Sequence, residues 1–390
     1  MFKLITGGHL FSPDDRGVQD ILIFDEKIAK IGGDLSSVAE QLGAEVISAE
    51  DRIVTPGFMD QHVHFLGGGD YEGPAGATTD IEFSSLTRSG ITTAVGCLGS
   101  EDVARNMLDL VRRARDLEKL GITTYVYSGS FNVPSPTITG SVRNDVTVID
   151  KVLGVKFAIS EAMASFASLS DLAEVAKDSF LGGLIGGKKG VVHIHVGRRP
   201  ERMDRLFDLL ETTGIPVCHF VPTHVNRSDP DVLDQAVRLL KMGGTVDLSA
   251  IMSPEYGSLT GIRPDRALSL ILEAGAPIDR VTMSSDGNVS MPILDEKGNK
   301  TGLTKVGVDS LYRMFLVIVE NCEVSFSDAL KVVTLNVART LGLQYRKGSI
   351  EAGKDADLLL LEKDYRIDTV FARGRVMVKD GREVVRGYFE

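Results

Sequence analysis

The spacing of the few histidines is the first sign of chemistry in this chain. There are seven histidines among 390 residues. His62 and His64 form an HxH pair, while His195 ends one later β-prone run and His224 follows another. Residues i and i+2 of a β-strand point to the same side, so the pair can aim two imidazoles at one point. Imidazole is a common ligand of zinc and its neighbours, so the pattern predicts a divalent-metal site.

Two further residues have the right type and place for this site. Asp286 directly follows the β-prone residues 280–284 and supplies a carboxylate. Lys156 lies near the end of another run, among apolar neighbours, where burial of a bare ammonium is costly. Two interpretations of Lys156 stay open. Either it is a strand-end lysine that reaches solvent, or it has reacted with CO2 and bridges two cations as a carbamate.

The other histidines and the cysteines are expected to take no part in this chemistry. We assign His9, His193 and His219 to structural positions, with His193 facing away from His195. The three cysteines are scattered and form no CxxC pair, so they predict neither a disulfide framework nor a zinc motif. A reducing cytoplasm is the expected location.

The candidate ligands require a fold that brings several strand ends together. Between residues 52 and 284, short β-prone runs alternate with stretches of helical period at an average spacing of about 32 residues. This alternation predicts an α/β protein with a (β/α)8 TIM barrel, whose active site lies at the carboxyl ends of the strands. An open doubly wound sheet is the alternative, but residues 67–69 lack the spacing of a nucleotide-binding glycine loop. The expected strands are residues 52–58, 92–97, 122–128, 152–159, 191–195, 215–221, 245–251 and 280–284.

The two ends of the chain differ from this middle, because they contain short strands and turns without helical stretches. Residues 369–378 have the pattern of a hairpin that turns near Arg373 and Gly374. The ends of a domain usually lie close together. We therefore expect residues 1–52 and 346–390 to form one small, sandwich-like β-domain beside a barrel over residues 53–345.

Composition narrows the possible partners. The 43 basic and 54 acidic residues give a net charge of −11. An acidic chain without basic blocks is a poor candidate for binding nucleic acid or an anionic membrane. The sequence has no apolar run of about 18 residues and no signal-peptide pattern at its start. We expect a cytoplasmic protein that binds neither nucleic acid nor membranes.

These features together resemble the amidohydrolase superfamily over essentially the whole chain. The marks are the HxH motif in Pro-Gly-Phe-Met-Asp-Gln-His62-Val-His64, the strand lysine, the two later histidines and Asp286. The segments at residues 67–69, 133–142, 181–188, 222–227 and 284–288 also resemble bacterial isoaspartyl dipeptidases. This resemblance implies a hydrolase that cleaves β-aspartyl dipeptides by attack of a metal-activated hydroxide on the amide.

The resemblance also implies a binuclear centre, most simply with zinc. One ion would be held by His62, His64 and Asp286, the other by His195 and His224, and a carboxylated Lys156 would bridge both. Asp286 would act as the catalytic residue, taking the proton of the attacking hydroxide and giving it to the leaving amine.

Substrate contacts follow from the same resemblance, with three departures. Arg227 and Ser290 would bind the substrate α-carboxylate. Ser100 and a loop glutamate would recognise the free α-amine. The family tyrosine that polarises the scissile carbonyl matches Phe131, a second arginine matches Met163, and the loop glutamate matches Tyr71.

Replacements for the lost groups are available nearby. Asp70 or Glu72 could take the amine after a shift of one residue, and Tyr71 or Tyr127 could supply the missing hydroxyl. The departures leave other substrates open: another dipeptide, an N-acyl amino acid or a cyclic amide. A non-catalytic assembly protein is a more distant alternative. The resemblance also implies a homo-oligomer, with octamers among the forms of its relatives.

Overall fold

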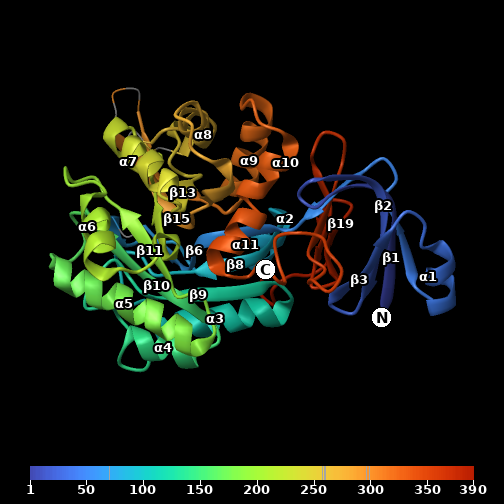
Figure 1. The fold of residues 1–390 in the computed structure, drawn as a ribbon, viewed down its shortest axis with the longest axis horizontal. Helices are drawn as coiled ribbons and strands as arrows, with labels where there is room; N and C mark the ends of the chain where they lie inside the picture. The colour runs from blue at the N-terminus through green and yellow to red at the C-terminus, as the bar shows by residue number, and fades with distance from the viewer. Residues whose placement is uncertain (70, 257, 259–260, 296, 298) are drawn as a thin grey trace.

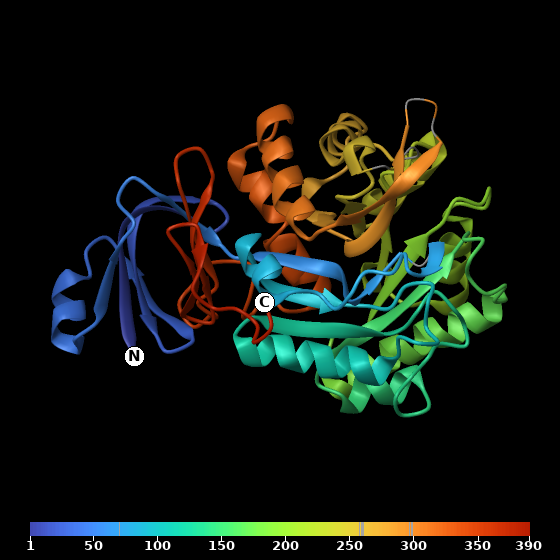
Figure 2. The same ribbon diagram turned by 180° about the vertical axis from the view of Figure 1, so that it is seen from behind.

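The computed structural model describes residues 1–69, 71–256, 258, 261–295, 297 and 299–390 (Figure 1). Two sheets organise these residues: one closes into a barrel, and the other joins both ends of the chain. Figure 2 shows the same arrangement from behind, with the N- and C-terminal segments side by side at one end of the molecule and the barrel at the other.

The barrel contains eight parallel strands within the described residues, which confirms the predicted TIM barrel. They are almost wholly buried, as expected for parallel strands packed on both faces. The ring closes where β15 (Gly287–Leu294) pairs in parallel with β6, with Gly287 opposite Val63. The barrel strands are β6 (Phe58–Gly68), β8 (Ile91–Gly96), β9 (Thr123–Gly129), β10 (Val152–Ile159), β11 (Val191–Val196), β12 (Phe220–Thr223), β13 (Val246–Ser249) and β14 (Val281–Ser284).

Helices surround the barrel because their apolar stripes pack against it. In α3, the Asn106 side chain caps the first turn by accepting the Asp109 amide, and Gly121 ends the helix. None of the helices among the described residues has the length and apolar character needed to cross a bilayer. The helices of this part are α2 (Phe83–Arg88), α3 (Met107–Leu120), α4 (Val142–Val148), α5 (Leu169–Gly186), α6 (Asp204–Thr213), α7 (Pro230–Lys241), α8 (Pro264–Glu273), α9 (Asp309–Asn321), α10 (Phe326–Val332) and α11 (Leu335–Leu341).

The second sheet takes strands from both ends of the chain and includes one that the sequence assigned to the barrel. β5 (Ile53–Pro56) pairs with β1 and β17. The prediction of a single barrel strand over residues 52–58 is therefore wrong. Pro56 and Gly57 divide this range, so that β5 belongs to the terminal sheet and the barrel starts with β6. The other strands here are β1 (Phe2–Phe11), β2 (Asp15–Phe24), β3 (Lys27–Gly32), β4 (Glu45–Ser48), β17 (Leu358–Leu361), β18 (Ile367–Ala372), β19 (Arg375–Lys379) and β20 (Arg382–Glu383), with α1 (Ser36–Leu42) beside them.

A buried charge cluster joins this sheet to the barrel. Lys347 is 2% exposed, and its Nζ lies 2.5 Å from Asp357 Oδ2 and 2.8 Å from Asp355 Oδ2. The same Nζ donates to the Thr123 hydroxyl at the start of β9, at 2.6 Å. Lys27 of β3 pairs with Asp355 at 2.6 Å.

Removal of the central cation should therefore destabilise the fold. We expect Lys347→Met to lower the free energy of unfolding by about 3 kcal/mol, because it leaves the buried Asp357 carboxylate without its counter-charge. Urea unfolding of Lys363→Met, which removes an exposed pair with Asp51, provides the control and should show no change. Equal unfolding midpoints for the two variants would contradict a structural role for the cluster.

Candidate active site

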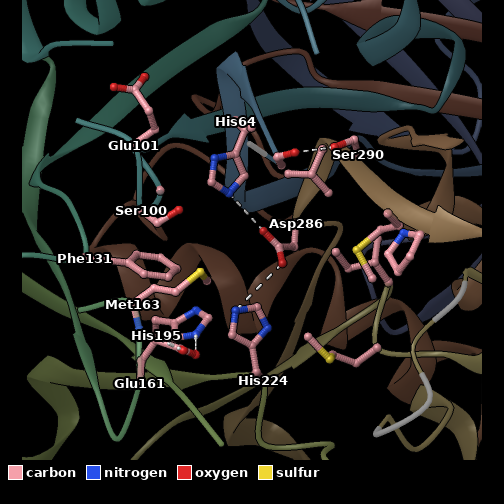
Figure 3. Close-up of a pocket in the computed structure, with 18 of the residues that line it drawn as sticks. His64, Ser100, Glu101, Phe131, Glu161, Met163, His195, His224, Asp286 and Ser290 are labelled. Atoms are coloured by element: carbon pink, nitrogen blue, oxygen red, sulfur yellow. Dashed lines mark hydrogen bonds and ion pairs between the residues drawn. The ribbon is translucent and has the colours of Figure 1, made fainter. Parts of the chain in front are cut away.

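The six predicted metal ligands converge at the carboxyl end of the barrel and line one cavity of ≈ 740 Å³. His62 and His64 lie inside β6, which extends further than the sequence suggested. Lys156 lies on β10 and His195 on β11. His224 comes directly after β12, and Asp286 comes two residues after the end of β14. Figure 3 shows both side chains facing the cavity.

The ligand atoms are spaced as ligands of a shared ion would be. His62 Nε2 and His64 Nε2 each lie 3.1 Å from Asp286 Oδ1, and His224 Nε2 lies 3.7 Å from Asp286 Oδ2. Two atoms bound about 2.1 Å from one zinc ion lie about 3.0–3.4 Å apart. The ligand atoms of His62, His224 and Asp286 all lie within 4.8 Å of one another, so this group could hold a metal ion, and the same holds for His62, His64 and Cys97.

The backbone turns two of these residues inward at a conformational cost. His224 and Asp286 have φ values of 65° and 52°, in the left-handed region that non-glycine residues rarely adopt. The Asp286 amide donates to the His62 carbonyl at 3.0 Å, which holds this conformation. Asn288, with a φ of 69°, donates its side-chain amide to the His64 carbonyl at 2.8 Å. Such strain is typical of functional sites.

The imidazoles have the protonation state that metal binding requires. Burial, the largest cause in each case, lowers the pKa of His62 and His224 well below the usual value and that of His195 to about 4. For His62 the positive charge of Lys156 acts in the same direction. All three are therefore neutral near pH 7 and carry a free lone pair.

The surroundings of Lys156 are unfavourable for a bare ammonium. The residue is fully buried, with Nζ 2.6 Å from His62 Nε2 and 3.1 Å from Cys97 Sγ. No carboxylate in the described part of the chain forms an ion pair with it. A buried ammonium among imidazoles lacks the counter-charge that usually compensates desolvation. The expected alternative of a lysine that reaches solvent is wrong.

The predicted substrate contacts line the same cavity: Arg227, Ser290, Ser100, Phe131 and Met163. Arg227 is 4% exposed, and its Nε donates to the Val196 carbonyl at 2.8 Å. The Ser290 hydroxyl donates to the Gly69 carbonyl at 2.5 Å. A Cβ at residue 69 would lie 2.2 Å from Ser290 Oγ, so this close approach requires glycine. The Phe131 ring lies 4.2 Å from the His195 ring between centroids.

The candidate replacements for the lost amine and carbonyl contacts have different outcomes. Asp70 lies outside the described residues, as do the side chains of Tyr71 and Glu72, although the backbone of residues 71–74 forms β7 (Tyr71–Pro74). Tyr127 is fully buried and stacks on His193, with ring centroids 4.9 Å apart. It is not among the described residues that line the cavity, so the idea that Tyr127 supplies a hydroxyl there is wrong.

Two residues near the ligands were missed by the sequence reasoning. His193 does not face away from His195, because residues i and i+2 share a face; its Nε2 lies 3.3 Å from His62 Nδ1. Glu161 Oε2 lies 3.2 Å from His195 Nε2. Burial raises the pKa of Glu161, but hydrogen bonds from His195 and from two backbone amides outweigh it and hold the pKa at about 2. Its position just after the Lys156 strand was the available signal.

The fold and this site place the chain in the amidohydrolase family, whose model matches residues 53–377. The family and the site define a metal-dependent hydrolase with a small-molecule substrate. The chain is similar to a β-aspartyl dipeptidase from Fervidobacterium islandicum AW-1, solved in complex with the dipeptide β-Asp-Leu. The two are 35% identical with a TM-score of 0.90, over 100% of both chains.

More distant relatives have other activities. An imidazolonepropionase from Brucella anthropi is 25% identical, over 91% of this chain and 89% of the relative. A D-hydantoinase from Thermus sp. is 18% identical with a TM-score of 0.73, over 98% and 96% of the two chains. The hydantoinase shows the shared fold alone.

Proposed function

We propose that this protein hydrolyses isoaspartyl (β-aspartyl) dipeptides with the help of two divalent ions. The observation that carries the proposal is the convergence of six candidate ligand side chains and a buried arginine in one cavity. The similarity to a dipeptidase that was solved with β-Asp-Leu supports the choice of substrate.

The residues present fit a binuclear centre. We assign His62, His64 and Asp286 to one ion, His195 and His224 to the other, and a carboxylated Lys156 to both. Zinc is the simplest choice for nitrogen and oxygen ligands in this number. Bound there, the ions would lower the pKa of a water molecule and polarise the amide carbonyl.

Asp286 moves the proton in this proposal. Its carboxylate lies within 3.1 Å of His62 Nε2 and His64 Nε2 and lines the cavity, so it can face both the metal and the substrate. It accepts the proton of the attacking water and returns it to the leaving nitrogen, since an amide anion is a very poor leaving group. General acid–base help of this kind contributes about 10²–10⁴ in rate.

The remaining cavity residues bind and orient the dipeptide. The Arg227 guanidinium offers a planar fork for a carboxylate, and Ser290 adds a hydroxyl beside it. Ser100, on the loop after β8, faces the cavity in Figure 3 and is assigned to the free α-amine together with an acidic side chain of the loop after β6. Met163 takes the place of a second arginine and contributes an apolar surface.

The missing tyrosine leads to a prediction about rate. Phe131 presents a ring beside His195, with Lys156 Nζ 5.5 Å from its centroid, but no hydroxyl that can polarise the carbonyl. Loss of one such donor typically lowers kcat by about 10²–10³. We expect Phe131→Tyr to raise kcat on β-Asp-Leu at least about tenfold. Steady-state assays with Phe180→Tyr, a ring change on α5, provide the control; a flat or reduced rate in Phe131→Tyr would count against this assignment.

The altered pocket also favours a second candidate: hydrolysis of another dipeptide, an N-acyl amino acid or a cyclic amide. The observation behind it is that Phe131 and Met163 lie in the cavity where the resemblance requires a tyrosine and an arginine. A panel with β-Asp-Leu, N-acetyl-Asp and a hydantoin, assayed with zinc and bicarbonate, distinguishes these substrates. Turnover of only the N-acyl or cyclic compounds would replace the dipeptidase proposal.

The proposal also includes the oligomeric state and the cellular location of the protein. The resemblance implies a cytoplasmic homo-oligomer, with an octamer among the forms of its relatives. Light scattering of the purified chain measures the oligomer. A non-catalytic assembly role, the most distant alternative, would be supported by less than one divalent ion per chain in a metal analysis.

A further inference from the structure

Glu161 is a buried carboxylate that the proposed mechanism does not use, although it lies against a proposed metal ligand. It comes two residues after β10 and lines the cavity. Its Oε2 lies 3.2 Å from His195 Nε2, and Figure 3 shows the two side chains facing each other. The two side chains are 12% and 11% exposed, so water competes little for this contact.

The local backbone fixes the direction of this carboxylate. Oε1 accepts the amides of Ala162 at 2.7 Å and Met163 at 3.3 Å. The preceding residue, Ser160, has a φ of 53°, and its hydroxyl donates to the Arg202 carbonyl at 2.7 Å. Both oxygens of Glu161 therefore act as acceptors, Oε1 toward the backbone and Oε2 toward His195.

This contact determines which nitrogen of His195 keeps the lone pair that can bind a metal. A neutral imidazole has one N–H and one lone pair, and an ionised carboxylate can only accept. With Oε2 as the acceptor, Nε2 carries the proton and Nδ1 keeps the lone pair. A histidine that binds a metal commonly donates its other N–H to a carboxylate, which fixes its tautomer and ring orientation.

We infer that Glu161 is a positioning residue for the second metal ion: it holds His195 as the Nε2–H tautomer and leaves Nδ1 to bind the ion. This inference rests on the binuclear centre of the proposed function. Glu161 acts through His195 and takes no part in the chemical step.

Glu161→Gln tests this role, because an amide has one acceptor oxygen and cannot accept on both sides. Glu101→Gln is the matched control. The Glu101 carboxylate lines the same cavity and accepts backbone amides with both oxygens, from Val103 at 2.8 Å and Arg105 at 3.1 Å. Glu101→Gln therefore makes the same chemical change within the same cavity, but on a carboxylate whose two oxygens both accept from backbone amides of its own loop.

Two readouts apply to both variants. Calorimetric titration of the metal-free protein with Zn²⁺ should show binding of the second ion weakened about 10–100-fold in Glu161→Gln, the range for loss of such an outer contact. The first ion, and both ions in Glu101→Gln, should keep their affinities. Two-bond ¹H–¹⁵N spectra of the histidine side chains should show the Nε2–H tautomer of His195 in wild type and Glu101→Gln, and a changed tautomer in Glu161→Gln.

The outcomes separate this inference from the proposed function. Unchanged zinc affinities and an unchanged His195 tautomer in Glu161→Gln would overturn the positioning role and leave the hydrolase proposal intact. An Nδ1–H tautomer of His195 in the metal-free wild type would overturn it too, and this measurement needs no variant to fold. A wild-type chain that binds no zinc would overturn the metal centre itself.

Discussion

Asp286→Asn is expected to abolish turnover while the chain still binds at least one metal ion. Asparagine has nearly the same shape, and its carbonyl oxygen can still face His62 and His64, whose Nε2 atoms lie 3.1 Å from Asp286 Oδ1. An amide cannot accept the proton of the attacking water at neutral pH. The loss in kcat should reach the upper part of the range for general acid–base catalysis, about 10⁴.

This variant is measured by kcat on β-Asp-Leu and by metal content per chain. Asp102→Asn is the matched control, because its carboxylate follows β8 and accepts from Asn132 at 3.0 Å but is not among the described residues lining the cavity. Its turnover should stay near wild type. Near-normal activity in Asp286→Asn would remove the proton transfer assigned to Asp286.

Lys156→Ala is expected to lose one ion per chain together with its activity. Nζ is fully buried and lies 2.6 Å from His62 Nε2, at the junction of the two proposed ion sites. Alanine removes the bridging group and leaves a small void beside the ligands. A short-chain carboxylic acid such as propionate should fill this void, restore the bridging carboxylate and return part of the metal and the turnover.

Lys151→Ala is the control for loss of a buried lysine. It precedes β10 at the opposite end of the same strand, where its Nζ donates to the Thr124 carbonyl at 2.9 Å. This variant should keep both ions, and propionate should not affect it. Full metal occupancy of Lys156→Ala in the absence of acid would exclude the carbamate.

The architecture of the barrel could be predicted because its signals are local. Alternating strands and helices, and the glycines and caps between them, depend on neighbouring residues, so β10 was predicted over the residues that it occupies. Two exceptions are the expected strand 215–221, which the structure has as β12 at Phe220–Thr223, and β5, which looks like the start of a barrel strand. Its assignment to the terminal sheet depends on pairing with β17, some three hundred residues away, and no local pattern carries that information.

The site was predictable to the extent that residue type and strand position determine it. The candidate ligands are chemically distinctive, and His195 and His224 sit at strand ends, which is why they could be singled out. The contacts around these side chains could not be predicted from the sequence. The local sequence does not distinguish Glu161 from another loop glutamate, because its contact with His195 depends on the turn at Ser160. The close approach of Ser290 to Gly69 joins residues that are far apart in the sequence.

Hydrolysis of isoaspartyl dipeptides is tested by comparing β-Asp-Leu with its isomer α-Asp-Leu on protein reconstituted with zinc and bicarbonate. The two dipeptides have the same atoms and charges and differ in which carboxyl group forms the amide, so the comparison isolates recognition of the isoaspartyl bond. We expect kcat/KM for β-Asp-Leu to exceed that for α-Asp-Leu by at least about a hundredfold, as loss of paired buried contacts would give. Equal rates for the two isomers, or no cleavage of either by the metal-loaded chain, would contradict the proposed function.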